Sequence, residues 1–226
     1  MKNIKDIRLK ASKKSGVTSD FIIKDKIIHY LKQFKTKGKS LLDFGAGKGE
    51  LIDILKKFDF SEVSGADLFK KPKSLDKDIK WYQLDLNNKF KIKKRFDFVI
   101  CSETIEHLEN PRHTLRTIFN ILKKSGVLIL TMPNNNSLRS YFSLIFKDHF
   151  VAFLDTCYPA HITAILEKDL IRICKEIGYK KPKIYFTNFG VIPKLTYTTW
   201  QKISLGLLKG RYFSDNLIMV VKKNNI

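Results

Sequence analysis

Residues 41–50 read LLDFGAGKGE, an apolar run that ends in a glycine-rich turn. Glycine lets a backbone turn sharply and approach a ligand closely. The run and the three glycines, Gly45, Gly47 and Gly49, therefore predict a buried strand, a tight turn at a ligand, and a helix after it.

The turn departs from two common phosphate-binding patterns. Glu50 stands where the dinucleotide fingerprint has its third glycine, and Lys48 is followed by Gly49, where a Walker loop has Ser or Thr. Asp43, just before the turn, places a carboxylate where it would repel a diphosphate. The stretch favours a cationic ligand.

Further apolar runs alternate with helical patterns along the chain. The runs lack polar alternation, which is typical of strands buried on both faces of a parallel sheet, and they are Ser40–Gly45, Val63–Leu68, Trp81–Leu86, Phe96–Ser102, Val127–Met132, Lys183–Thr187 and Leu217–Lys222. The expected helices are Thr18–Phe34 with Thr18 or Ser19 as its cap, Glu50–Phe58, Arg112–Lys124 stopped by Ser125-Gly126, and Glu167–Gly178. This rhythm predicts an α/β, doubly wound sheet.

The chain is long enough for one domain, residues 1–226. We divide it into an N-terminal helical cap (1–37), a cofactor-binding half (38–133) and a substrate half (134–222). The substrate half contains an irregular aromatic segment, 134–160, and a long aromatic and basic insertion, 189–213. We expect these two insertions to form a lid.

The formal net charge of +21 is the strongest compositional signal. Such a charge attracts nucleic acid, anionic lipid or phosphorylated substrates. Most of the excess is lysine spread along the whole chain, however, which a lysine-rich proteome explains equally well. Three cysteines without a CxxC pair, no signal core and no apolar run of about 18 residues predict a cytoplasmic protein without a transmembrane segment.

The stretch Leu41–Leu51 resembles motif I of class I methyltransferases, which take their methyl group from S-adenosylmethionine. The resemblance implies a Rossmann-like, doubly wound sheet of seven strands, mostly parallel with one antiparallel strand. Asp43 would accommodate the cationic end of the donor, and Gly45, Ala46 and Gly47 would line it.

The ends of the next three runs carry the rest of this resemblance. Asp67, beside Leu68, stands where these enzymes hold both ribose hydroxyls, an arrangement that suits a carboxylate. By the same resemblance, Asp85 takes the adenine amino group and Leu86 the neighbouring ring edge. Backbone groups of Cys101 and Ser102, in the counterpart of motif IV, would line the methionine end. Open α/β sheets bind ligands at these strand ends.

Directly after the fourth run, Glu103, Glu106 and His107 lie at positions i, i+3 and i+4, so one helical turn would present all three on one face. Two carboxylates and an imidazole could ligate a divalent ion. His161 follows much later, before the Glu167–Gly178 helix. The alternative is that Glu106 is a helix-surface residue and His161 a loop residue that caps the next helix.

The ExxEH pattern with a distant histidine resembles two groups of metal-dependent O-methyltransferases. One acts on catechol-like precursors in ubiquinone biosynthesis, and the other methylates the 2′-hydroxyl at small-RNA 3′ ends with two Glu and two His as magnesium ligands. The resemblance implies that Glu103, Glu106, His107 and His161 hold Mg²⁺ or Mn²⁺. Without a metal, His107 or His161 would serve as the catalytic base.

The layout from Met132 onward resembles small bacterial methyltransferases associated with surface-polysaccharide synthesis. Gly178-Tyr179 replaces their usual Gly-Phe, and Ala164-Ile165 replaces Phe-Thr. We expect O-methylation of a small hydroxylated metabolite, a sugar or sugar precursor of a cell-surface glycan. The alternatives are RNA 2′-O-methylation, a quinone or catechol acceptor, and a non-enzymatic scaffold.

Overall fold

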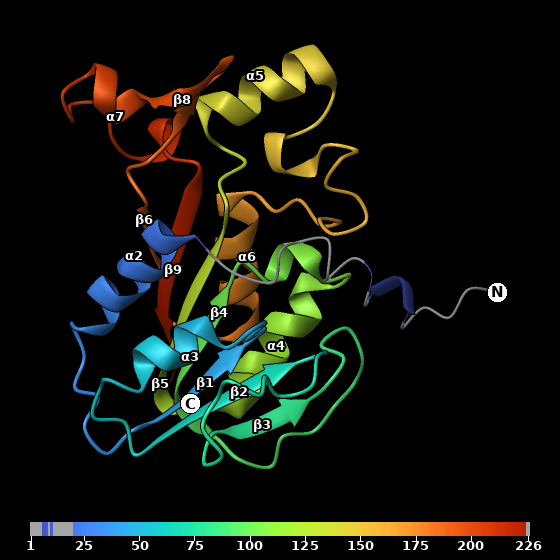
Figure 1. The fold of residues 1–226 in the computed structure, drawn as a ribbon, viewed down its shortest axis with the longest axis vertical. Coiled ribbons are helices and arrows are strands. Elements are labelled where there is room, and N and C mark those ends of the chain that lie inside the picture. Colours follow the sequence, from blue (N-terminus) through green and yellow to red (C-terminus); the bar gives the residue numbers. More distant parts are fainter. Residues whose placement is uncertain (1–5, 9, 11–19, 225–226) are drawn as a thin grey trace.

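The computed structural model describes residues 6–8, 10 and 20–224. Its main feature is a sheet of seven strands, β1 (Ser40–Phe44), β2 (Glu62–Asp67), β3 (Lys80–Gln83), β4 (Phe96–Ser102), β5 (Leu122–Pro133), β6 (Lys183–Phe186) and β9 (Asn216–Lys222). Their order is β3-β2-β1-β4-β5-β9-β6 (Figure 1). Strand β9 runs antiparallel to both of its neighbours, and the pairs among β1 to β5 are parallel. The predicted sheet is confirmed.

Helices cover both faces of this sheet. Helices α2 (Phe21–Leu31) and α3 (Glu50–Leu55) pack on one face, and α4 (Pro111–Ile121) and α6 (Glu167–Ile177) pack on the other (Figure 1). Neighbouring residues of one strand, such as Leu41 and Leu42, enter opposite cores and are fully buried. Both faces of a strand are thus apolar, which explains the runs without alternation.

The two insertions lie together beyond the carboxyl ends of the strands, at the top of Figure 1. They comprise α5 (Leu138–Lys147), the 3-10 turns η2 (Val151–Phe153) and η3 (Arg211–Phe213), a hairpin of β7 (Val191–Ile192) and β8 (Leu195–Thr199), and α7 (Trp200–Ile203). Helix α5 contacts both η2 and η3. The interpretation of 134–160 as irregular is therefore wrong: Ser137 caps a helix there, with its side chain accepting from the Ser140 N–H.

The largest boundary error concerns the junction of α4 and β5. The helix ends at Ile121 rather than at Lys124, and Leu122 already pairs with Phe96. The register then shifts before Val127, and Lys123 Nζ donates to Asp97 Oδ2 at 2.7 Å. Ser125-Gly126 therefore belong to the strand and do not stop the helix.

Other boundaries differ by a few residues. Helix α3 ends before Phe58, and β3 ends at Gln83, so Asp85 lies in the turn after that strand. Helix α2 is capped by Asp20, whose Oδ1 accepts the Ile22 N–H at 3.2 Å; the predicted caps Thr18 and Ser19 lie outside the described residues. Among the described helices, none has the length and apolarity to cross a bilayer.

Candidate functional site

The glycine-rich turn is held against the carboxyl end of β2. The N–H groups of Gly45 and Ala46 both donate to Ala66 O, at 2.8 and 3.1 Å, and the Gly47 N–H donates to Asp67 Oδ2 at 2.8 Å. Gly49 is the N-cap of α3 with φ +79°. The turn and Asp67 therefore form one hydrogen-bonded unit.

Two features of the position of Gly45 exclude any residue with a side chain. Its φ is +89°, and a Cβ at this position would lie 2.2 Å from Thr104 Oγ1. Thr104 is itself fixed, because its hydroxyl donates to Ser102 O at 2.9 Å. The turn thus packs directly against the segment that follows β4.

Two adjoining cavities open at the carboxyl ends of the strands. The Asp43 cavity, of about 280 Å³, is lined by Asp43, Gly45, Ala46, Ser102, Glu103, Glu106, His107 and His161 among others. The Asp67 cavity, of about 290 Å³, is lined by Gly45, Gly47, Asp67, Leu68, Asp85, Leu86, Glu103 and His107 among others. Because Gly45, Glu103 and His107 line both, the two cavities adjoin; together they are called the cleft, which the three aspartates at the strand ends line.

The residues predicted to bind the donor line this cleft with one exception. Cys101 is fully buried within β4 and lines neither cavity. Burial raises the pKa of its thiol well above the ordinary value. Its neighbour Ser102 does line the Asp43 cavity.

Asp43 and Asp67 are buried carboxyl groups. Burial, followed by repulsion from Asp67, raises the pKa of Asp43 to about 7, and Lys24 opposes this shift. Burial also raises the pKa of Asp67, although the N–H groups of Phe69 and Gly47 donate to its carboxylate. Asp43 would ionise more readily beside a cationic ligand.

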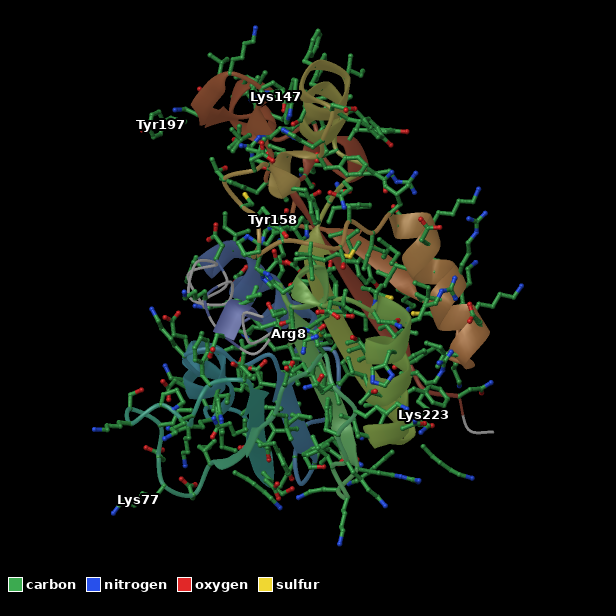
Figure 2. All side chains as sticks on the ribbon, turned by 90° about the vertical axis from the view of Figure 1, so that its right-hand side faces the viewer. Arg8, Lys77, Lys147, Tyr158, Tyr197 and Lys223 are labelled. Atoms are coloured by element: carbon green, nitrogen blue, oxygen red, sulfur yellow. The ribbon has the colours of Figure 1, made fainter. Side chains whose placement is uncertain are left out.

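Asp85 is tied to the N-terminal segment. Its Oδ2 accepts from Arg8 Nη1 at 2.7 Å, and its Oδ1 accepts from the Asn87 N–H at 3.0 Å. Arg8 and Ile7 line the Asp67 cavity from the N-terminal segment. Tyr158, labelled above Arg8 in Figure 2, lines the same cavity. Sequence reasoning missed Arg8, because an ion pair between such distant residues leaves no local pattern.

Glu106, His107 and His161 come together in the Asp43 cavity. One possible ligand atom from each lies within 4.8 Å of the other two. Glu106 is 2% exposed, and neither of its carboxylate oxygens has a hydrogen-bond partner. An unpartnered buried carboxylate is costly, so this arrangement suits a bound cation.

The backbone brings His161 to this place. The N–H groups of Ile162 and Thr163 both donate to Glu106 O at 3.0 Å. The Thr163 hydroxyl donates to Leu108 O at 2.6 Å. The segment around His161 is thereby fixed beside η1 (Ile105–His107).

Both imidazoles use Nδ1 for a backbone carbonyl. His107 Nδ1 lies 2.7 Å from Ala160 O, and His161 Nδ1 lies 2.6 Å from Ala152 O. A carbonyl only accepts, so Nδ1 carries the proton and Nε2 keeps its lone pair. Burial lowers the pKa of His107 to about 4 and also lowers that of His161. Both rings are therefore neutral near pH 7 and able to ligate a metal.

Glu103 does not join this group. It precedes η1 with φ +45°, so the three residues do not share one α-helical turn, which corrects the prediction. Its Oε2 accepts from Asn216 Nδ2 at 2.9 Å, while burial raises its pKa to about 7. Glu103 lies in the cleft but faces Asn216 at the start of β9.

The cleft fits S-adenosylmethionine in its donor set. A buried carboxylate, Asp43, stands where a cationic group would bind, and Asp67 and Asp85 offer acceptors further along the same cleft. Carboxylates suit an ammonium, a pair of ribose hydroxyls and an amino group.

Comparison with known proteins supports this interpretation. Residues 21–182 match the family model of a methyltransferase domain. The chain is similar to the ubiquinone biosynthesis O-methyltransferases of Azoarcus sp. (strain BH72), 24% identical over 70% of this chain and 71% of that one, and of Coxiella burnetii (strain Dugway 5J108-111), 27% identical over 65% and 69%.

Solved structures show the same fold at low identity. A SAM dependent methyltransferase from Archaeoglobus fulgidus has a TM-score of 0.60 at 20% identity, covering 95% of this chain and 98% of that one. The plantazolicin methyltransferase BpumL, in complex with a triazolic desmethylPZN analog and SAH, has a TM-score of 0.62 at 18% identity, covering 97% and 91%. The family match spans more than half of the chain. With its sheet and its cleft, the chain belongs to the class I methyltransferases that use S-adenosylmethionine as methyl donor.

Proposed function

We propose that this methyltransferase transfers the methyl group to a hydroxyl of a small, uncharged polyhydroxy acceptor, a sugar or sugar precursor of a cell-surface glycan. The proposal includes a divalent ion, Mg²⁺ or Mn²⁺, held by Glu106, His107 and His161. The observation that carries it is the Glu106 carboxylate, buried and unpartnered beside two neutral imidazoles.

In this proposal the three strand-end aspartates bind the donor along the cleft. Asp43 accommodates the cationic methionine end, Asp67 accepts from the ribose hydroxyls, and Asp85 accepts from the adenine amino group. Support comes from the two cavities adjoining each other, with Gly45, Glu103 and His107 in the lining of both. The bound donor supplies a methyl group on a sulfonium, from which an acceptor oxygen takes it.

A metal role for the histidines is favoured over a role as base. A base with a pKa of about 4, as in His107, takes up a proton weakly near pH 7. The same low pKa keeps the ring neutral, which is the form that ligates a metal. A divalent ion would lower the pKa of an acceptor hydroxyl. Glu106 and the two Nε2 atoms would fix its position beside the methyl group.

The charge of the Asp43 cavity favours an uncharged acceptor. Its lining includes Asp20, Glu50 and Glu103, while the basic side chain among its lining residues, Lys24, is paired with Glu50. Apart from the proposed divalent ion, a phosphorylated acceptor would meet no arginine fork among the described residues that line this cavity. The net charge of +21 therefore gives no support to RNA methylation at this cavity.

A catechol is the second candidate acceptor. The curated relatives are ubiquinone biosynthesis O-methyltransferases, and a catechol presents two neighbouring hydroxyls to a divalent ion as a sugar diol does. The two candidates share the metal and differ in the acceptor.

A methyl-transfer screen tests the proposal. Metal-free enzyme with radiolabelled donor is offered free sugars, nucleotide sugars, catechols and a short RNA, in EDTA and then with excess Mg²⁺ or Mn²⁺. We expect label in an uncharged sugar, dependent on added metal. Label only in RNA or in phosphorylated acceptors would refute the acceptor class, and full activity in EDTA would refute the metal.

A further inference from the structure

We infer that Arg8 is a donor-binding residue that completes the adenosine end of the cleft, together with Ile7. Both lie outside the part of the chain that matches the family model, which begins at residue 21. The inference rests on the adenosine placement proposed above and is independent of the acceptor and of the metal.

Arg8 bridges two sides of the Asp67 cavity. On one side, its Nη1 donates to Asp85 Oδ2 at 2.7 Å and to Asn88 Oδ1 at 3.3 Å. On the other side, Nη2 and Nε donate to Glu109 Oε1 at 2.6 and 3.2 Å. Asp85 follows β3 and Glu109 follows η1, and both line the cavity. The guanidinium therefore joins the two segments between which adenosine is placed.

The burial of Arg8 sets it apart from the exposed lysines. Its side chain is 17% exposed, and that of Asp85 is 12% exposed. Figure 2 shows Arg8 at mid-height on the side turned to the viewer, between the ends that carry Lys77 and Lys147. Removal of one partner of a shielded ion pair leaves the other charge uncompensated, whereas loss of a surface ion pair changes little.

Arg8 also limits what Asp85 can still accept. Asp85 already receives hydrogen bonds from Arg8, from Asn88 Nδ2 and from the Asn87 N–H. A carboxylate has about four acceptor positions, so roughly one remains for an adenine amino group. Arg8 thus fixes the carboxylate that would read adenine, and its planar guanidinium is suited to stacking on a purine ring.

Removal of Arg8 should weaken the adenosine end selectively. Losing a hydrogen bond to a charged group reduces affinity by roughly ten- to hundredfold. We expect Arg8→Ala to weaken S-adenosylhomocysteine and 5′-methylthioadenosine by the same factor in this range, because the latter lacks the amino-acid end. The affinity of Arg8→Lys for both ligands should lie between those of the wild type and of Arg8→Ala, since one ammonium cannot bridge Asp85 and Glu109 as a guanidinium does.

Calorimetric titration of both ligands tests this, with melting temperatures as the check on folding. Arg112→Ala is the matched control, because Arg112 forms an exposed pair with Glu176. Wild-type affinity in folded Arg8→Ala, or an equal loss in Arg112→Ala, overturns the inference. Asp67→Asn separates the role of Arg8 from the proposed adenosine site. Unchanged ligand affinity in Asp67→Asn refutes the adenosine site itself. Reduced affinity in Asp67→Asn together with wild-type affinity in Arg8→Ala refutes only the role of Arg8.

Discussion

The imidazole rings of His107 and His161 lie edge to face with their centroids 4.7 Å apart. Each ring is anchored through Nδ1 to a different carbonyl, Ala160 O or Ala152 O, so neither can turn without losing a hydrogen bond. The two anchored imidazoles and the Glu106 carboxyl group therefore form a preset group. Anchoring of this kind is typical of metal-binding histidines.

Glu106→Gln tests whether the buried carboxylate binds a cation. Loss of an outer partner of a metal ligand costs about 10- to 100-fold in affinity or activity, so loss of a ligand should cost at least about hundredfold in Mn²⁺ affinity and methyl transfer. The melting temperature should change little, because the amide of Gln is an unpartnered buried polar group in place of the carboxyl group. Methyl-transfer rates at saturating donor, measured over a range of Mn²⁺ concentrations, give the first two effects, and a melting curve gives the third.

The exposed Glu176→Gln serves as the control for Glu106→Gln, since Glu176 lies on the surface in a pair with Arg112. It should retain wild-type rates and Mn²⁺ affinity. Undiminished activity of Glu106→Gln, with metal present, would remove Glu106 from the proposed ligand set.

Thr163→Val tests how His161 is positioned. The variant keeps the shape of the side chain and removes the hydrogen bond to Leu108 O. We expect a loss of about 1 kcal/mol in the free energy of unfolding, the usual contribution of one such bond. Methyl transfer should fall more than donor affinity does, because the bond lies on the side of His161. Ser61→Ala, which removes an exposed hydrogen bond to Lys39 O, is the control. It should leave stability, methyl transfer and donor affinity unchanged. An equal loss of donor affinity in Thr163→Val would contradict this role.

Gly45→Ala tests the turn that supports the donor. The left-handed backbone costs roughly 1–2 kcal/mol for a residue with a Cβ, and the contact with Thr104 adds roughly 1–3 kcal/mol of overpacking. Gly38 provides the control, because its φ is +72° but a Cβ there would have no atom within 4 Å. We expect Gly38→Ala to lose stability only, and Gly45→Ala to lose donor binding as well, in parallel unfolding and calorimetric measurements. Equal donor affinity in the two variants would contradict the close packing at Gly45.

The strands were predictable where the apolar runs are continuous. Both ends of β4 were predicted at Phe96 and Ser102, because its buried residues from Phe98 to Cys101 alternate between the two cores without a polar interruption. The start of β5 was not predicted. Lys123 and Ser125 are exposed there, and this irregular stretch is a strand only because it pairs with β4. The pattern of residues along the chain carries no information about such partners.

The site was predictable only in part for similar reasons. The order of Asp43, Asp67 and Asp85 at the strand ends indicated one cleft, because parallel strands end at the same edge. Outside the site, helix α5 was missed because Ile145 and Phe146 are about three-quarters exposed, 74% and 76%, and no buried apolar stripe marks the helix.

The pH dependence of donor binding follows from Asp43. Its pKa of about 7 means that a substantial fraction is protonated below neutrality, whereas a cationic donor requires the carboxylate. We expect affinity for S-adenosylmethionine to rise by roughly tenfold between about pH 6 and about pH 8, since affinity changes up to tenfold for each pH unit below the pKa. The measurement is calorimetry in two buffers with different ionisation enthalpies, which also detects proton release on binding below pH 7.

The stability of the ligand-free protein should change in the opposite direction. The pKa of Asp43 is higher in the folded chain than its ordinary value of 3.8, so the folded state binds the proton more tightly. The free energy of unfolding is therefore highest near pH 4 and falls as the pH rises from about 4 to about 7. Asp43→Asn should flatten the affinity profile and reduce the slope of the stability profile, to which Glu103, with a pKa of about 7, contributes as well. Glu103→Gln should leave the affinity profile in place. If Glu103→Gln flattens the affinity profile and Asp43→Asn does not, the cationic end of the donor binds at Glu103 and the assignment of Asp43 is wrong.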